Sequence, residues 1–217
     1  MDNGALPIVV AALFVLGVVG FAAGVLLDVR ALRLVAKPIP VLALAALAGA
    51  SEGRYARILA AGLALGAVGD VLLEIGPRLF VAGLGAFLIG HVAYVVAFVV
   101  EERRARILRA IPPFLLGVGV LSQLWAGLGA MAIPVTVYML VICAMGYRAG
   151  AMVEPGRKGA WLALGGALLF LVSDTLLGIH RFHTPLPAGR VLILATYWLA
   201  QLLIALSARA LVPRKAA

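Results

Sequence analysis

Two aspartates lie in nearly the same apolar frame, "GDVLLEI" at residues 69–75 and "SDTLLGI" at residues 173–179. These acids, Asp70 and Asp174, are 104 residues apart. Placing an ionisable group in hydrocarbon costs about 2.5–3.5 kcal/mol or more, so such a group normally faces a bundle interior or a wet cavity and marks function. A pair of buried carboxyl groups can supply one acid and one base. We therefore interpret Asp70 and Asp174 as a candidate acid/base pair.

Further polar residues occur at helical spacing inside apolar segments. His91 and Tyr94 are three residues apart and Tyr197 and Gln201 are four apart, so each pair shares a helix face. If the segments cross a membrane as assigned below, Asp70, Asp174, His91, Tyr197 and Gln201 all fall at roughly 8–18 Å from one surface. Several helices are thus predicted to deliver acids, an imidazole and hydroxyls to one layer.

The composition is that of an integral membrane protein. Of the 217 residues 65% are hydrophobic and 12% charged, and the mean hydropathy is +1.14, whereas soluble domains are roughly 45–50% apolar. Residues 8–27 carry no charge, and about twenty residues suffice for one crossing. The net charge of +9 is scattered through short loops. We therefore expect anionic lipid headgroups, and not nucleic acid, as its counterpart.

Charge clusters and Gly/Pro clusters divide the chain into eight apolar segments. The sequence predicts an all-α polytopic membrane helical bundle of about eight transmembrane helices in a single integral membrane domain, 1–217. Pro38 and Pro40 suit the first turn of the short second span. The predicted spans are 6–27, 38–50, 58–75, 79–100, 111–128, 131–147, 160–179 and 191–211.

The distribution of basic residues predicts the orientation. Eight spans place both termini on one side, and twelve of the eighteen Lys and Arg residues fall on that side. Because cytoplasmic loops are enriched in Lys and Arg, both termini are predicted to be cytoplasmic. We expect a multi-pass protein of the cell membrane, with Lys37 at the outer mouth of the second span.

These residues together resemble the YhhN-like family of membrane proteins, whose characterised members are lysoplasmalogenases. No single motif is specific, but their order and spacing through the spans are similar to the family pattern. The pattern runs through Lys37-Pro38, Gly69-Asp70, His91 and Tyr94, Ser173-Asp174, Tyr197 and Ala200-Gln201. One departure is Gly66-Ala67-Val68, which leads into Gly69-Asp70 where the family often has Ser or Thr. A hydroxyl at that place is therefore not essential to this chain.

The resemblance implies hydrolysis of the vinyl ether bond of a lysophospholipid, a lysoplasmalogen, to a fatty aldehyde and glycerophosphoethanolamine or glycerophosphocholine. Such a reaction needs an acid to protonate the alkene and a base to activate water, and it requires no metal or other cofactor. The expected catalytic residues are Asp70, Asp174 and His91. The expected substrate-binding residues are Lys37, Tyr94, Ser173, Tyr197 and Gln201.

Structural readings of the same residues stay open. The aspartates could form a polar network that holds helices together, and His91 could be an interior histidine with satisfied hydrogen bonds. Ser173 could bond its own helix backbone, and Tyr138 could be a packing residue. Glu74, near a span end, could reach only the interface.

Other functional classes also stay open. Intramembrane acids serve as proton relays in transporters, and the similar spacings from Asp70 to Tyr94 and from Asp174 to Tyr197 suggest a repeat. Against transport, the polar residues leave the inner half of each helix apolar. A metal-dependent lipid hydrolase would need His91, His180 and His183 to converge. An accessory membrane protein would have no turnover.

Overall fold

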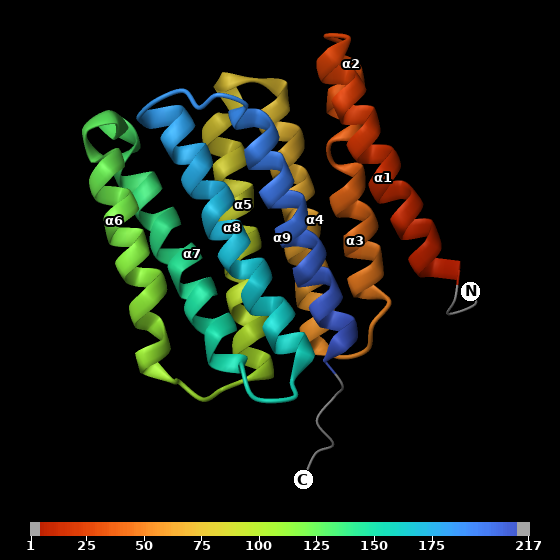
Figure 1. Ribbon diagram of the computed structural model, residues 1–217, viewed down its shortest axis with the longest axis vertical. Helices are drawn as coiled ribbons and strands as arrows, with labels where there is room; N and C mark the ends of the chain where they lie inside the picture. The colour runs from red at the N-terminus through yellow and green to blue at the C-terminus, as the bar shows by residue number, and fades with distance from the viewer. Residues whose placement is uncertain (1–4, 212–217) are drawn as a thin grey trace. The chain divides into compact units, whose positions relative to one another are not determined.

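The computed structural model describes residues 5–211, and every regular element among these residues is a helix (Figure 1). The predicted all-α class is confirmed for this part of the chain. The α-helices are α1 (Ala5–Leu26), α2 (Arg30–Ala36), α3 (Ile39–Gly49), α4 (Arg54–Ile75), α5 (Phe80–Glu101), α6 (Ile111–Leu128), α7 (Ala132–Met152), α8 (Lys158–Phe182) and α9 (Gly189–Ala210). Short 3-10 helices η1 (Pro77–Leu79), η2 (Ile107–Ala110) and η3 (Gly129–Met131) connect some of them.

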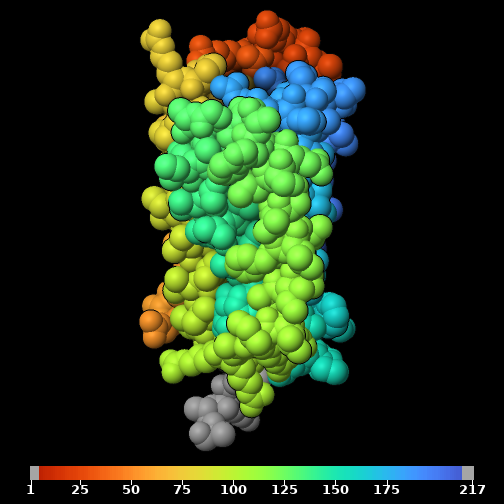
Figure 2. All heavy atoms as spheres, turned by 90° about the vertical axis from the view of Figure 1, so that its left-hand side faces the viewer, coloured from red at the N-terminus to blue at the C-terminus, as the bar shows by residue number. Residues whose placement is uncertain are grey.

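Between residues 5 and 211, seven helical stretches are long and apolar enough to cross a membrane. One of these, Arg30–Gly49, combines α2 with α3, and another, Ile107–Met152, contains both α6 and α7. Helix α6 lies on the face of the second unit that Figure 2 shows, and many of its exposed side chains are apolar. Side chains there that are more than half exposed are Ile111, Leu115, Leu116, Val118 and Trp125. Such a surface suits contact with lipid chains.

The chain forms two compact units, residues 1–94 and residues 95–217. In the first unit α1 packs on α2 and α3, while α4 packs on α2 and α3. In the second unit α8 packs extensively on α9, and α6, α7 and α8 contact one another. Figure 1 shows the helices of each unit running alongside their neighbours. The single domain expected over residues 1–217 stays a prediction.

The second predicted span begins as expected but is preceded by an additional helix. Pro38 caps α3 and Pro40 lies in its first turn, where a missing N–H costs no helical hydrogen bond. The residues before it, which the sequence suggested were a loop, form α2 and include Arg30 and Arg33. Arg33 forms the ion pairs described below, and Arg30 donates to the carbonyl oxygen of Ile75, so both charged side chains of this helix have partners on α4.

Helix α7 extends beyond the expected end of its span at residue 147. The next residue, Arg148, is buried, and its guanidinium donates to the carbonyl oxygens of Glu102 and Arg104. Arg109 donates to the carbonyl oxygen of Val153 at 2.8 Å, just after the last turn of α7. Carbonyl groups at a helix C-terminus have no partner within the helix. Arg109 of η2 thus binds the C-terminal end of α7, and the connection between α5 and α6 accepts the guanidinium of Arg148.

Candidate active site

Asp70 lies on α4 where helix α5 approaches very closely. A Cβ atom added to the preceding Gly69 would lie 2.6 Å from the ring of Phe87 on α5. A Cβ atom on Gly90 would lie 3.1 Å from the carbonyl oxygen of Gly62. Side chains do not fit at such distances, so small residues allow the two helices to pack. The glycine of the Gly69-Asp70 motif is therefore explained by packing, and Asp70 itself is buried.

The packing of α5 on α4 shows at which level along the α4 axis each polar residue of the first unit lies. The helices are antiparallel, because residues successively later on α5 pack against residues successively earlier on α4. The paired positions are Gly83 with Leu73, Phe87 with Gly69, Gly90 with Gly66 and Tyr94 with Gly62. His91 follows Gly90, so Asp70, His91 and Tyr94 occupy successive levels about one turn, or ~5.4 Å, apart.

His91 and Tyr94 are both buried on α5, with 1% of each side chain's surface exposed. Their ring centroids are 6.2 Å apart in an edge-on arrangement. This confirms that the two residues share a helix face. The tyrosine ring also lies against Gly62, where an added Cβ atom would overlap it. Tyr94 is thereby held between α4 and the imidazole of its own helix.

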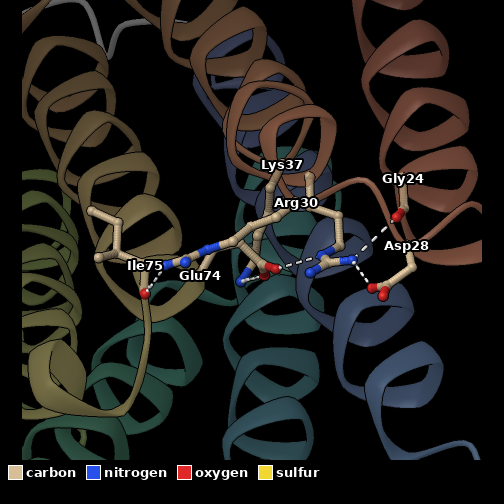
Figure 3. A network of polar contacts seen from close by, with 7 residues as sticks. Gly24, Asp28, Arg30, Lys37, Glu74 and Ile75 are labelled. Carbon is tan, nitrogen blue, oxygen red and sulfur yellow. Dashed lines mark hydrogen bonds and ion pairs between the residues drawn. The ribbon is translucent and has the colours of Figure 1, made fainter.

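One turn after Asp70, the carboxylate of Glu74 binds two cations from the N-terminal helices (Figure 3). Its Oε1 atom lies 3.0 Å from Nε of Arg33, and its Oε2 atom lies 3.4 Å from Nζ of Lys37. Arg33 also donates to Asp28 at 2.9 Å. We call these four residues, Asp28, Arg33, Lys37 and Glu74, the Glu74 cluster. Glu74 thus pairs with two cations.

In the second unit, Asp174 on α8 accepts a hydrogen bond from Tyr138 on α7. The distance from the tyrosine hydroxyl to Oδ2 of the aspartate is 2.6 Å. The tyrosine is buried, with 7% of its surface exposed, while Asp174 is half-buried. A hydroxyl that donates to a carboxylate at this distance makes a strong, charge-assisted hydrogen bond. Tyr138 therefore orients the carboxyl group of Asp174.

Helix α9 carries the other polar residues of the second unit. The amide nitrogen of Gln201 donates to the hydroxyl oxygen of Tyr197 at 3.2 Å, which confirms that they share a face. The Tyr197 ring packs edge-on against Phe170 of α8, with centroids 5.4 Å apart. Ser173 donates to the carbonyl oxygen of Ile193 at 3.0 Å. That bond joins α8 to α9 and is not made within the serine's own helix.

The similarity of this chain to known proteins covers the site residues predicted from sequence. The model of the YhhN family matches residues 32–208. The chain belongs to the YhhN family. All the candidate site residues predicted from sequence, from Lys37 to Gln201, fall within the matched part.

Several YhhN-like relatives of this chain carry an enzyme name. Over 186 residues it is 38% identical to lysoplasmalogenase TMEM86B of Homo sapiens, covering 82% of this chain and 76% of that protein. Over 214 residues it is 35% identical to lysoplasmalogenase of Mycobacterium bovis, covering 88% of this chain and 80% of that protein. Lysoplasmalogenase TMEM86A of Bos taurus is 37% identical over 162 residues, covering 68% and 63% respectively. No solved structure matches the chain.

The predicted site residues of this YhhN protein fall into one set in each unit. Lys37, Asp70, His91 and Tyr94 belong to the first unit, and Ser173, Asp174, Tyr197 and Gln201 belong to the second. Within each set, adjacent helices bring the members to neighbouring levels. The meeting of Asp70 with Asp174 in one pocket stays a prediction.

Sequence reasoning missed the roles of Tyr138, Arg33 and Glu74. Tyr138 carries the hydroxyl that contacts Asp174, and a lone tyrosine inside an apolar span was the available signal. Arg33 and Lys37 are four residues apart, as are Asp70 and Glu74. Each spacing places both members on one helix face, which could have suggested an ion pair between two helices.

The histidines considered for a metal site have different surroundings. Nδ1 of His180 accepts a hydrogen bond of 2.9 Å from the backbone N–H of Leu186, in the loop before α9. His91 lies in the first unit, whereas His180 and His183 lie in the second. Over residues 5–211, the His, Cys, Asp and Glu side chains form no group of three or more that could hold a metal ion.

Proposed function

We propose that this YhhN family protein is a lysoplasmalogenase, a membrane hydrolase that cleaves the vinyl ether bond of lysoplasmalogens. The observation that carries the proposal is its identity of 35–38% with lysoplasmalogenases of mammals and mycobacteria over most of the chain. The family match contains both aspartates. The products are a fatty aldehyde and glycerophosphoethanolamine or glycerophosphocholine.

The proposed reaction is acid-catalysed addition of water to the vinyl ether. A carboxylic acid protonates the outer alkene carbon, and the ether oxygen stabilises the resulting oxocarbenium ion, as in glycoside hydrolysis. A carboxylate takes a proton from water as the water oxygen bonds to the cationic carbon, giving a hemiacetal. The carbon–oxygen bond to glycerol then breaks. The glycerol oxygen receives the proton that the base had taken from water, and the hemiacetal hydroxyl gives its proton to the first carboxylate, which restores both groups.

We assign the ionised role to Asp174 and the proton-donating role to Asp70. Supporting this assignment, Asp174 accepts the hydrogen bond from Tyr138, which stabilises negative charge on its carboxylate. Asp70 is buried on α4, with 2% of its surface exposed, and burial raises the cost of ionising a carboxyl group. His91, one level away, would relay protons or orient water.

The remaining residues are proposed to bind the substrate. Lys37 would bind the phosphate as a cation at the mouth of the site. The alkenyl chain would lie between helices among apolar side chains. The residues proposed to position water and the glycerol are Tyr94, Ser173, Tyr197 and Gln201.

We also propose how the chain crosses the membrane. α2 with α3 would make one crossing, and α6 and α7 would cross separately, giving eight spans in a single membrane domain. Both termini would then be cytoplasmic and the protein would lie in the cell membrane. This arrangement is supported by the excess of basic residues on the side of the termini.

The test is release of fatty aldehyde from alkenyl-glycerophosphoethanolamine by the purified full chain in detergent. Asp70→Asn and Asp174→Asn should each lower kcat by about 10²–10⁴-fold, the usual contribution of a general acid or base. Wild-type activity in either folded variant would contradict the acid/base roles. A wild-type protein that releases no aldehyde from ethanolamine or choline lysoplasmalogens would refute the function.

Two further measurements separate the alternatives. A proton-coupled transporter would move the lipid across a vesicle membrane without releasing aldehyde. Lys37→Met should raise KM and leave kcat nearly unchanged if Lys37 binds phosphate. An unchanged KM would contradict that role.

A further inference from the structure

The Glu74 cluster contains two cations and two carboxylates, so it can pair with both the negative and the positive group of a zwitterion. Its two cations, Arg33 and Lys37, share the carboxylate of Glu74, with one carboxylate oxygen directed to each cation. The non-bridging oxygens of a phosphodiester carry the same single negative charge on two oxygens. Glu74 therefore occupies the position that a phosphodiester would take between Arg33 and Lys37.

Exposure within the cluster decreases from its edge toward Asp70. The Asp28 side chain is 94% exposed, that of Arg33 is 14% exposed and that of Glu74 is 9% exposed. The charged groups therefore form a row that leads from solvent toward the buried acid. Asp28 lies at the open end, where a mobile cationic group could reach its carboxylate.

The spacing of the row matches that of a glycerophospholipid headgroup. Glu74 follows Asp70 by four residues, which is about 6 Å along α4. In a lysoplasmalogen the ether oxygen and the phosphorus are joined through the glycerol by five single bonds, which span about 6 Å at the ~1.2 Å per bond of an extended chain. A phosphate at the Glu74 position would thus leave the ether level with Asp70. The ammonium group, beyond the phosphate, would point toward the open end.

We propose that the Glu74 cluster selects zwitterionic headgroups by exchange of ion pairs. The phosphodiester of the lipid takes the cations Arg33 and Lys37 from Glu74, and the lipid's ammonium group pairs with the released carboxylate of Glu74. Arg33 keeps its separate contact with Asp28. The exchange leaves no charge without a partner. A headgroup with a phosphate and no ammonium leaves Glu74 facing the phosphate, and like charges repel. Glu74 is in this proposal a specificity-determining residue.

This proposal rests on the proposed function for its substrate, and a binding measurement tests it separately from turnover. The probes are 1-alkyl-lysophospholipids, whose saturated ether cannot be cleaved this way, with either a phosphoethanolamine or a bare phosphate headgroup. Their dissociation constants for the purified full chain would be measured by calorimetry in detergent. Glycerophosphoethanolamine and inorganic phosphate, as soluble competitors, distinguish the lipid headgroup from a free anion as the ligand.

Glu74→Gln should lower the preference for phosphoethanolamine over bare phosphate by about tenfold, the effect of losing one charge-assisted contact. Glu74→Asp keeps the charge and should keep the preference. Glu101→Gln is the matched control, because Glu101 pairs with Arg157 in the second unit at similar exposure, 18% and 14%. That control should leave the preference unchanged.

Should Glu74→Gln fail to fold, Lys37→Gln replaces it, because this variant keeps the ion pair between Arg33 and Glu74. It should weaken binding of both headgroups about equally. The proposal is overturned if folded Glu74→Gln retains the wild-type preference, or if Lys37→Gln leaves both affinities unchanged. If the wild-type protein releases aldehyde but one of these two results is obtained, the headgroup proposal is overturned and the proposed function still stands. A shifted preference in a protein without turnover would overturn only the function.

Discussion

Removing the hydroxyl of Tyr138 should slow the reaction without unfolding the protein. In Tyr138→Phe the hydrogen bond of 2.6 Å to Asp174 is lost while the ring continues to fill its place. A hydrogen bond to a charged group contributes about 1.5–3 kcal/mol. Because Asp174 is half-buried, water can replace part of the contact. We therefore expect a fall in kcat of about 10- to 50-fold, from the lower part of that range.

The assay compares initial rates of aldehyde release at saturating lysoplasmalogen. Tyr147→Phe is the matched control, since Tyr147 lies on the same helix and its ring contacts Arg148, which a phenylalanine ring also allows. A double variant, Tyr138→Phe with Asp174→Asn, completes the test. If the hydroxyl acts through Asp174, the kcat of the double variant should be only slightly lower than that of Asp174→Asn alone.

Two results would refute this reasoning. A kcat for Tyr138→Phe within about twofold of wild type would mean that the hydrogen bond has no catalytic value. Additive losses in the double variant would mean that Tyr138 acts independently of Asp174.

Three further predictions concern the packing that positions the site. Gly69→Ala should lower the melting temperature through overlap with the Phe87 ring, at a cost of about 1–3 kcal/mol, and Phe87→Leu should restore part of the loss. Gly166→Ala should be more damaging and have no such rescue, because the added Cβ would lie 2.9 Å from a backbone oxygen of α9; an unchanged melting temperature in detergent would contradict this. Ser173→Ala should cost about 1 kcal/mol of stability through loss of its bond to Ile193, and an additional rise in KM would support substrate binding by Ser173.

The positions of several helices along the chain were predictable, because charges and glycines interrupt the apolar segments. The predicted span 111–128 coincides with α6, which ends where Gly129 adopts a positive φ of 49°. A residue in that left-handed region stops a helix, and glycine adopts it without steric cost. Asp70 and Asp174 were recognisable for a similar reason, since an acid is conspicuous among leucines.

The hydrogen-bond partners of those residues were less predictable. The hydropathy pattern indicates how deep in the membrane a residue lies, but it does not indicate which neighbouring helix its side chain faces. Tyr138 and Asp174 are 36 residues apart in sequence. Their contact depends on how α7 and α8 are rotated against each other. Similarly, Arg33 and Glu74 belong to segments that each looked like a span end or a loop. Their ion pair exists because α2 is helical and packs on α4.

The last five residues of α7, which begin with Arg148, bring the helix to the thickness of a hydrocarbon core. The 21 residues of α7 measure about 32 Å, close to the ~30 Å thickness of a hydrocarbon core. A helix that ended before Arg148 would have 16 residues, about 24 Å, and would leave the bilayer locally thinned. The backbone oxygens of the α5–α6 connection solvate this cation in place of water. A loop between two other helices thus holds the turns that bring α7 to this length.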